Sequence, residues 1–350
     1  MEIHREPSES SYDTPFFLSE IRTRLFACLY AHDKALSNIL DRPPRIPRHY
    51  CNRKLPLDVS DEKLLSSGST LEEILLGLDS EGWNGEESCP TDLLRARYEF
   101  ATLREDILSV RLGAPNGDNE TFVRQIPLRI TTIWDGLPPR VRFDPNAPDL
   151  GKPYTYITNL LLYLEYLDLY NCAQQLLCGY TDKNDDPSLL QLALTLVTTA
   201  VNCARRYSRQ FGASKEMSSI LWIYGLPSAI VLANAMRQRA ELGQDMPRPM
   251  AWASLYRQLS VLASELEADA DPKDANYAFY SERSRLLSEQ LDHALNARHC
   301  PTPSEASTLI STSSSEMSIG EIGLVATAGA DDFADTLTSI AMDAERFDGT

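Results

Sequence analysis

We predict an all-α fold for this chain, a multi-helix bundle with a disordered N-terminal lead and an acidic C-terminal tail. Apolar residues recur at helical spacing over several long segments, and no strand-like alternation of useful length occurs. Hydrophobic residues make up 43% of the 350 residues, which is enough to build a core. We expect the lead over residues 1–13, one helical domain over 14–300 and the tail over 301–350.

The first helix is predicted over residues 14–40. Thr14 followed by Pro15 is a good start signal, and the pair Pro43 and Pro44 ends the helix because proline fixes φ and lacks a donor. At the helix end, Asp33 and Arg42 are the candidates for an ion pair. The residues that share the apolar face are Ile21, Leu25, Cys28, Leu29, His32, Leu36 and Ile39.

The following segments alternate between helices and breaks. A proline-rich basic loop is expected over 41–62 and a variable surface excursion over 66–90, with one short helix inside it. The segment 159–170 is apolar on nearly all sides, which is typical of a helix in the middle of a bundle. Helices are expected over 71–78, 91–112, 159–170, 188–208, 214–240, 249–268 and 273–298.

One segment, 217–236, is a run without a charge that is long enough to span a membrane. It also contains serines, a glycine, a proline and an asparagine, which weaken it as a lipid-facing helix. Two buried helices with a turn or a kink at Gly225–Pro227 explain it better. A membrane-associated helical protein stays open as an alternative, and no membrane partner is expected.

Charge and cysteine usage limit the classes of function. The formal net charge is −17, so the mean field of the chain repels phosphate and direct DNA contact is not expected. The seven cysteines are scattered, without Cys-x-x-Cys spacing, and are typical of reduced, mainly buried thiols in a nuclear or cytosolic protein. Motifs for phosphate binding, metal binding and nucleophilic catalysis are missing. We therefore predict no enzyme and no catalytic, cofactor-binding or metal-binding residue.

Two motifs carry a resemblance to a known family. The first comprises Phe26, Tyr30 and Asp33 on the first helix, then Arg42, Pro43 and Pro44, then Leu55 and Pro56. The second comprises Trp134, Leu137 and Pro138, where the tryptophan is expected as a core anchor in preference to a ligand-stacking side chain. Together they resemble the fungal-specific transcription factor regulatory domain, the middle homology region of zinc binuclear cluster regulators. Asp41 stands where that family usually has glycine.

The resemblance implies a regulatory part of a fungal transcription regulator, located in the nucleus. Such a domain responds to an effector or protein partner and controls transcription by RNA polymerase II, with DNA contacted only indirectly. The zinc ions of the family belong to an N-terminal cysteine cluster that this chain does not carry, so no cofactor is expected. The family's domain normally begins well upstream of position 14, and we expect its missing helices to leave a docking face on helix 14–40 exposed.

The tail over 301–350 holds nine acidic residues and one basic residue. Its helical-period residues over 332–347 are typical of an activation segment that folds on the transcription machinery, and docking back onto its own domain is an equal alternative. A rival function is a DNA-blind modulator that dimerises with itself or with full-length relatives. The candidate activation face consists of Phe333, Leu337, Ile340 and Phe347.

Overall fold

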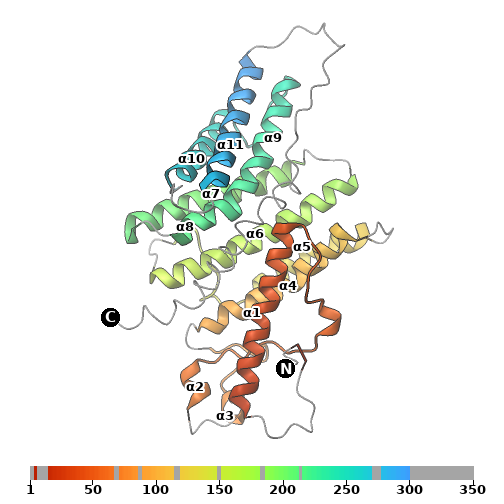
Figure 1. Cartoon of the computed structure of the whole chain (residues 1–350), viewed down its shortest axis with the longest axis vertical. Helices are drawn as coiled ribbons and strands as arrows, with labels where there is room; N and C mark the ends of the chain where they lie inside the picture. The colour runs from red at the N-terminus through yellow and green to blue at the C-terminus, as the bar shows by residue number, and fades with distance from the viewer. Residues whose placement is uncertain are drawn as a thin grey trace. The chain divides into compact units, whose positions relative to one another are not determined.

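The computed structural model describes residues 15–66, 71–85, 89–113, 119–147, 151–181, 186–212, 215–269 and 277–299, together with His4 and Arg5. The predicted all-α fold is confirmed (Figure 1): these residues are mostly helical, and their β pairing is one isolated bridge between Leu78 and Asn84. The α-helices are α1 Phe16–Leu40, α2 Asp61–Leu65, α3 Leu71–Leu76, α4 Pro90–Leu112, α5 Asn119–Gly136, α6 Pro153–Thr181, α7 Pro187–Phe211, α8 Lys215–Ile220, α9 Leu226–Glu241, α10 Trp252–Asp269 and α11 Tyr277–His299.

Contacts divide the stretch that we expected to be one domain into two compact units. The described residues of unit 1 end at Ala173, and those of unit 2 begin at Gln174. Both residues lie within α6.

In unit 1, α4 packs against both α1 and α5. The start of α4 is fixed by Asp92, whose carboxylate accepts a hydrogen bond from the Cys89 backbone N–H at 3.0 Å. This bond satisfies a donor that the helix itself leaves free. The fully buried side chains of the unit include Phe26, Tyr30, Phe100, Leu103, Ile107, Ile126, Ile130, Leu160 and Leu162.

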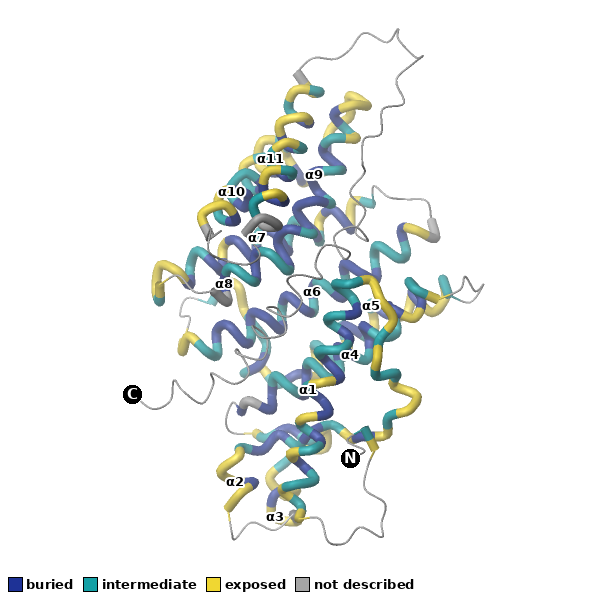
Figure 2. Tube along the Cα trace, viewed as in Figure 1, coloured by how far each residue is buried: buried dark blue, intermediate teal, exposed yellow. Residues whose placement is uncertain are grey.

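Helix α1 buries a face other than the apolar one that the spacing indicates. Ile21, Leu25 and Leu29 are 43, 50 and 41% exposed. Figure 2 shows this alternation of buried and exposed positions along α1. Polar groups can be buried where they find hydrogen-bond or charged partners. The polar residues of the buried face of α1 find such partners on α4 and on the loop after α1. Its residues are Glu20, Thr23, Phe26, Ala27, Tyr30, Ala31, Lys34 and Ser37.

Three helices that begin in unit 1 differ from prediction. The sequence predicts no helix over 119–136, where α5 runs, and none over α2. In α5 the helix passes through Pro127, whose carbonyl accepts hydrogen bonds from Thr131 Oγ1 and from the Tyr170 hydroxyl, each at 3.0 Å. The predicted helix 159–170 extends to the whole of α6. Tertiary burial thus stabilises helix where local signals suggest a break.

In unit 2, α7 packs against α9 and α10, and α11 packs against α9 and α10. Asp186 caps α7 by accepting a hydrogen bond from the Ser188 backbone N–H at 2.7 Å. The apolar faces of these helices form one core, which is why the charge-free stretches of the sequence lie here. Its fully buried residues include Leu190, Val197, Ala200, Leu232, Ala233, Met236, Leu259, Leu262 and Leu287.

The charge-free run after residue 216 forms α8, a π-helical turn at Leu221–Gly225 and α9. Gly225 lies close to α10, since a β-carbon there would lie 3.3 Å from Leu262 Cδ1. Two helical stretches among the described residues, Pro187–Phe211 and Met217–Glu241, have the length and apolarity of a membrane span. In the most apolar 18-residue window of each stretch, more than half of the residues are buried inside the chain, as in core helices of soluble proteins, so this is weak evidence for a span.

Candidate functional site

The first motif surrounds a buried lysine in unit 1. Lys34 Nζ lies 2.8 Å from Asp33 Oδ2, 3.3 Å from Glu105 Oε2 and 2.5 Å from the Ile46 carbonyl oxygen, and its side chain is fully buried. It also lies 4.0 Å from the centre of the Tyr30 ring. A buried ammonium needs such partners, because an unpaired one is strongly unfavourable.

The same carboxylates hold the motif loop, which we define as residues 41–60. Asp33 accepts hydrogen bonds from the backbone N–H groups of Arg45 and Ile46, both at 2.9 Å. Glu105 of α4 accepts one from the Arg48 N–H at 2.8 Å and another from the Tyr30 hydroxyl at 2.6 Å. One charge cluster therefore ties α1, the motif loop and α4 together.

Asp33 does not pair with Arg42, contrary to the ion pair that we predicted. The Asp33 carboxylate is occupied by Lys34 and by the loop N–H groups, while the Arg42 side chain is exposed. The loop turns at Asp41, which adopts φ 50° and ψ 47°, the left-handed region that favours glycine. Asp41 also pairs with Arg111 of α4 at 3.0 Å.

The other end of the motif loop is held by α1 and by a buried carboxylate pair. Glu20 accepts the Leu57 N–H at 2.9 Å, and Arg24 donates to the Val59 carbonyl at 2.6 Å. Asp58 is fully buried and lies 2.7 Å from Arg140 Nη2, whose same nitrogen lies 2.9 Å from Asp92 Oδ1.

Burial is the largest cause of the pKa shift at Asp58, and it raises the pKa from 3.8 to about 6. The neighbouring Asp92 acts in the same direction, while Arg140 and the Asn84 N–H oppose it. Burial and the Glu105 carboxylate likewise raise the pKa of the Tyr30 hydroxyl. Asp58 and Tyr30 are fully buried and already paired, so both help to fix the position of the motif loop.

The structure brings part of the first motif together. Phe26 and Tyr30 are buried, with ring centres 5.9 Å apart, and Tyr98 of α4 lies 5.0 Å from Tyr30. In the loop, Pro56 is buried and its carbonyl accepts a hydrogen bond from Arg95, whereas Leu55 and Pro44 are half-buried. Arg42 and Pro43 are exposed and lie outside this cluster.

The second motif joins α5 to α6. Trp134 stacks on Tyr166 with ring centres 4.5 Å apart and also approaches Tyr163 at 5.5 Å. It is half-buried, while Leu137 is buried and Pro138 is half-buried. The expected anchor is thus an aromatic stack at the edge of the core. The predicted activation face, Phe333, Leu337, Ile340 and Phe347, lies outside the described residues.

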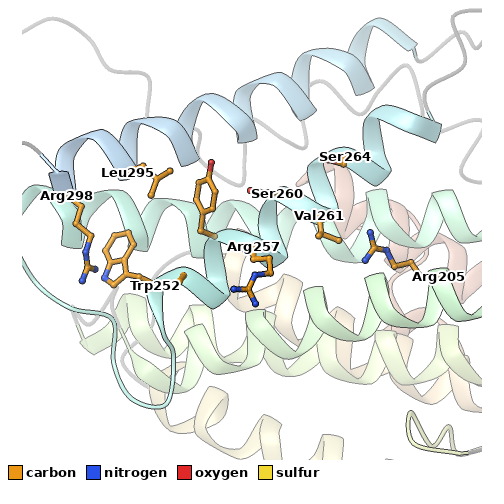
Figure 3. Close-up of a pocket in the computed structure, with 10 residues that line it drawn as sticks. Arg205, Trp252, Arg257, Ser260, Val261, Ser264, Leu295 and Arg298 are labelled. Atoms are coloured by element: carbon orange, nitrogen blue, oxygen red, sulfur yellow. The ribbon is translucent and has the colours of Figure 1, made fainter.

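A groove of about 740 Å³ lies in unit 2, and we call it the arginine groove. It is lined by Arg205 of α7, by the first turns of α10 and by Leu295 and Arg298 of α11 (Figure 3). Arg298 stacks over the Trp252 ring at 4.4 Å and pairs with Asp245 at 2.7 Å, and Arg205 pairs with Glu265 at 2.6 Å.

Two of the side chains that line the arginine groove, Arg257 and Trp252, have donors without an acceptor among the described residues. Within the described part of the chain, Arg257 makes no hydrogen bond or ion pair, and the buried Trp252 Nε1 has no acceptor. None of the lining residues is acidic. The groove is therefore suited to an anionic or acceptor-rich occupant with an apolar part.

Sequence reasoning did not single out the arginine groove. Trp252, Tyr256 and Ser260 recur at a spacing of four on α10, which places them on one helical face. This spacing is a local signal from which one face of the groove could have been predicted. The arrival of Arg205 and Arg298 at the same place depends on helix packing, which no local pattern encodes.

Among the described residues, no group of three His, Cys, Asp or Glu side chains could hold a metal ion. The described cysteines are free thiols, four of them buried: Cys89, Cys172, Cys178 and Cys203. Comparison with known proteins gives no match to a family model, to a curated protein or to a solved structure.

Proposed function

We propose that this chain is the regulatory part of a fungal transcription regulator. It responds to an effector or a protein partner and acts on transcription by RNA polymerase II, in the nucleus, with DNA contacted by another chain or segment. This proposal starts from the resemblance of the two motifs to the middle homology region.

One observation carries the proposal. Part of the first motif, namely Phe26, Tyr30, Asp33 and Pro56, contributes to one framework that joins α1, the motif loop and α4. Asp33 and Lys34 hold one end of the loop, and the buried Asp58 holds the other. A framework whose charges are all paired suits a body that relays signals, because it leaves no reactive group free.

The test is a reporter assay with the full chain fused to an unrelated DNA-binding domain in a fungal cell. We expect the fusion to enter the nucleus and to change reporter expression at least several-fold relative to the DNA-binding domain alone. A fusion that is excluded from the nucleus, or that leaves expression unchanged, argues against the proposal.

A matched control separates activation from unspecific effects of an acidic tail. Replacing Phe333, Leu337, Ile340 and Phe347 by serine keeps every charge of the tail but removes its apolar side chains. If the tail acts as an amphipathic helix on the transcription machinery, this variant loses the activation while the fusion remains nuclear.

A second candidate, the DNA-blind dimerising modulator, is favoured by the outward face of α1. Phe17, Ile21, Leu25 and Leu29 form an exposed apolar row along that helix, at spacings of four residues. Such a row is suited to packing against another helix. The partner of this candidate is a second copy of the chain or a full-length relative.

A further inference from the structure

The arginine groove stands out electrostatically in this chain. Arg205, Arg257 and Arg298 line it, no lining residue is acidic, and yet the chain as a whole carries a net charge of −17. The acidic partners of two arginines are open to solvent to different degrees: the side chain of Glu265 is half-buried, at 33% exposed, and that of Asp245 is 83% exposed. Exposed pairs of this kind exchange partners at little cost.

Part of the groove lining is apolar and is supplied by Trp252, Tyr256, Val261 and Leu295. In Figure 3, Arg298 and Arg205 lie at opposite ends of the view, with Arg257 between them. A simple inorganic anion would satisfy the guanidinium groups and leave these apolar side chains uncovered. The occupant that fits both features carries acidic groups together with a row of apolar side chains.

The chain itself contains a segment of this chemistry. Residues 332–347 place Phe333, Leu337, Ile340 and Phe347 on one face of a potential helix and four acidic residues elsewhere. The tail 301–350 carries nine acids and one base, so its charge is opposite to that of the groove.

The connection between the two is short enough. Arg298, at the end of α11, is itself part of the groove wall, and the tail begins directly beyond this helix. The linker 301–331, taken as an ideal chain, has a root-mean-square span of about 30 Å. Helix α10 is about 27 Å long, so the linker reaches any point along the groove.

We propose that residues 332–347 bind, as an amphipathic helix, in the arginine groove of the same chain. The apolar row covers Trp252 and Tyr256, and the acidic residues face Arg205, Arg257 and Arg298. Because the linker keeps the segment at an effective concentration on the order of millimolar, even a weak contact is largely occupied. The interaction does not depend on a role in transcription.

The first test measures hydrogen exchange on the full chain. The variant Arg205→Gln/Arg257→Gln removes two groove charges, and the control Arg237→Gln/Arg285→Gln removes two from exposed i,i+4 pairs elsewhere in unit 2. We expect exchange in 332–347 to speed up on the order of tenfold in the groove variant and to stay at the wild-type rate in the control. Equal exchange in all three proteins overturns the proposal.

The second test leaves the groove unchanged. A fluorescent peptide of residues 330–350 is titrated into the wild-type chain and into a full chain with the four apolar tail residues replaced by serine. The replaced tail cannot occupy the groove, so we expect this variant to bind the peptide at least about tenfold more tightly than the wild type. Equal affinities, or no binding to either protein, overturn the proposal.

The hydrogen-exchange test also distinguishes an intrachain contact from binding to a second copy. If protection of 332–347 rises with protein concentration, the segment binds a second copy and the intrachain contact is overturned. Since exposed arginines carry the contact, raising the salt concentration must weaken it, and salt-independent protection contradicts it. A reporter assay that fails while both of these tests succeed would reject only the role in transcription.

Discussion

At the scale of single residues, unit 1 is organised by buried charges that each find a partner far away in sequence. Lys34 is enclosed by Asp33, Glu105 and the Ile46 carbonyl, and Arg140 bridges Asp58 and Asp92. Buried ion pairs contribute little net stability by themselves, but breaking one leaves a charge without compensation. Their role here is to fix where the motif loop lies.

Replacing Lys34 by alanine is expected to destabilise the chain by about 3–5 kcal/mol, because two carboxylates and a carbonyl lose their buried partner. Urea unfolding followed by circular dichroism measures this. The control Lys63→Ala, at an exposed lysine of α2, should stay within about 0.5 kcal/mol of the wild type. A loss below about 1 kcal/mol for Lys34→Ala would show that the cluster is not a buried network.

The left-handed conformation of Asp41 leads to a second prediction, on the stability of two variants at this position. Asp41→Gly and Asp41→Ala both lose the ion pair with Arg111, but only alanine suffers the steric penalty of positive φ. We expect the glycine variant to be more stable than the alanine variant by about 0.5–1 kcal/mol, after allowance for the greater freedom of glycine in the unfolded chain. Thermal unfolding of the pair checks this, and equal stability would contradict it.

The raised pKa of Asp58 predicts a dependence of stability on pH. The pKa of Asp58 is about 6 in the folded chain, whereas its ordinary value is 3.8. Between these two pH values the folded chain therefore binds more protons than the unfolded chain. The contribution of Asp58 is therefore full below about pH 4 and is lost as pH rises through 6. We therefore expect the free energy of unfolding of the wild type to fall relative to that of Asp58→Asn as the pH rises from 4.5 to 6.5. Denaturant unfolding at each pH measures it, and a pH-independent difference rules out the raised pKa.

At the scale of elements, a few charged residues define how a strongly apolar helix is oriented against its neighbour. Glu165 and Asp168, the only charges within the apolar run of α6, pair with Arg97 and Arg104 of α4, each at 2.8 Å. These pairs fix the rotation of α6 on α4, since a rotated helix would bury both carboxylates alone. Helix α1 shows the opposite situation, because its apolar row remains at the surface.

If a second copy covers the outward face of α1, Leu25→Glu must weaken self-association. The substitution places a charge in the centre of the apolar row, and a tenfold or greater rise in the dimer dissociation constant is expected, about 1.4 kcal/mol or more. Light scattering after size exclusion measures the association. The matched control is Leu76→Glu, at an exposed leucine of α3.

For this prediction, the informative result is the comparison of the two leucine variants. A wild-type chain that is monomeric at all concentrations excludes self-association through α1. A dimer that both variants weaken equally would place the contact elsewhere.

At the scale of the whole molecule, charge is the property with the clearest consequence. With 50 acidic against 33 basic residues, the chain repels the DNA backbone. We expect no binding to a random DNA duplex at physiological salt at about 10 µM protein, where basic DNA-binding proteins bind unspecifically. Fluorescence anisotropy checks this, and saturable binding that weakens steeply with salt would contradict it.

The sequence by itself predicted the all-α class and most of the helices, because helical periodicity and proline breaks are local properties of the chain. It missed α5, where Pro127 suggests a break but buried Val123, Ile126 and Ile130 hold the helix. It also found the residues of the motif loop, although it paired Asp33 with Arg42 instead of Lys34.

Only the tertiary structure decided which face of α1 is buried and where the arginine groove lies. Periodicity identified the apolar row of α1, yet the buried face contains Glu20 and Lys34, because their partners come from the motif loop and α4. Arg140 and Asp58 are 82 positions apart, and Arg298 meets Trp252 across two helices. Such encounters depend on how helices pack, and the burial of a charge is favourable only once its partner has arrived.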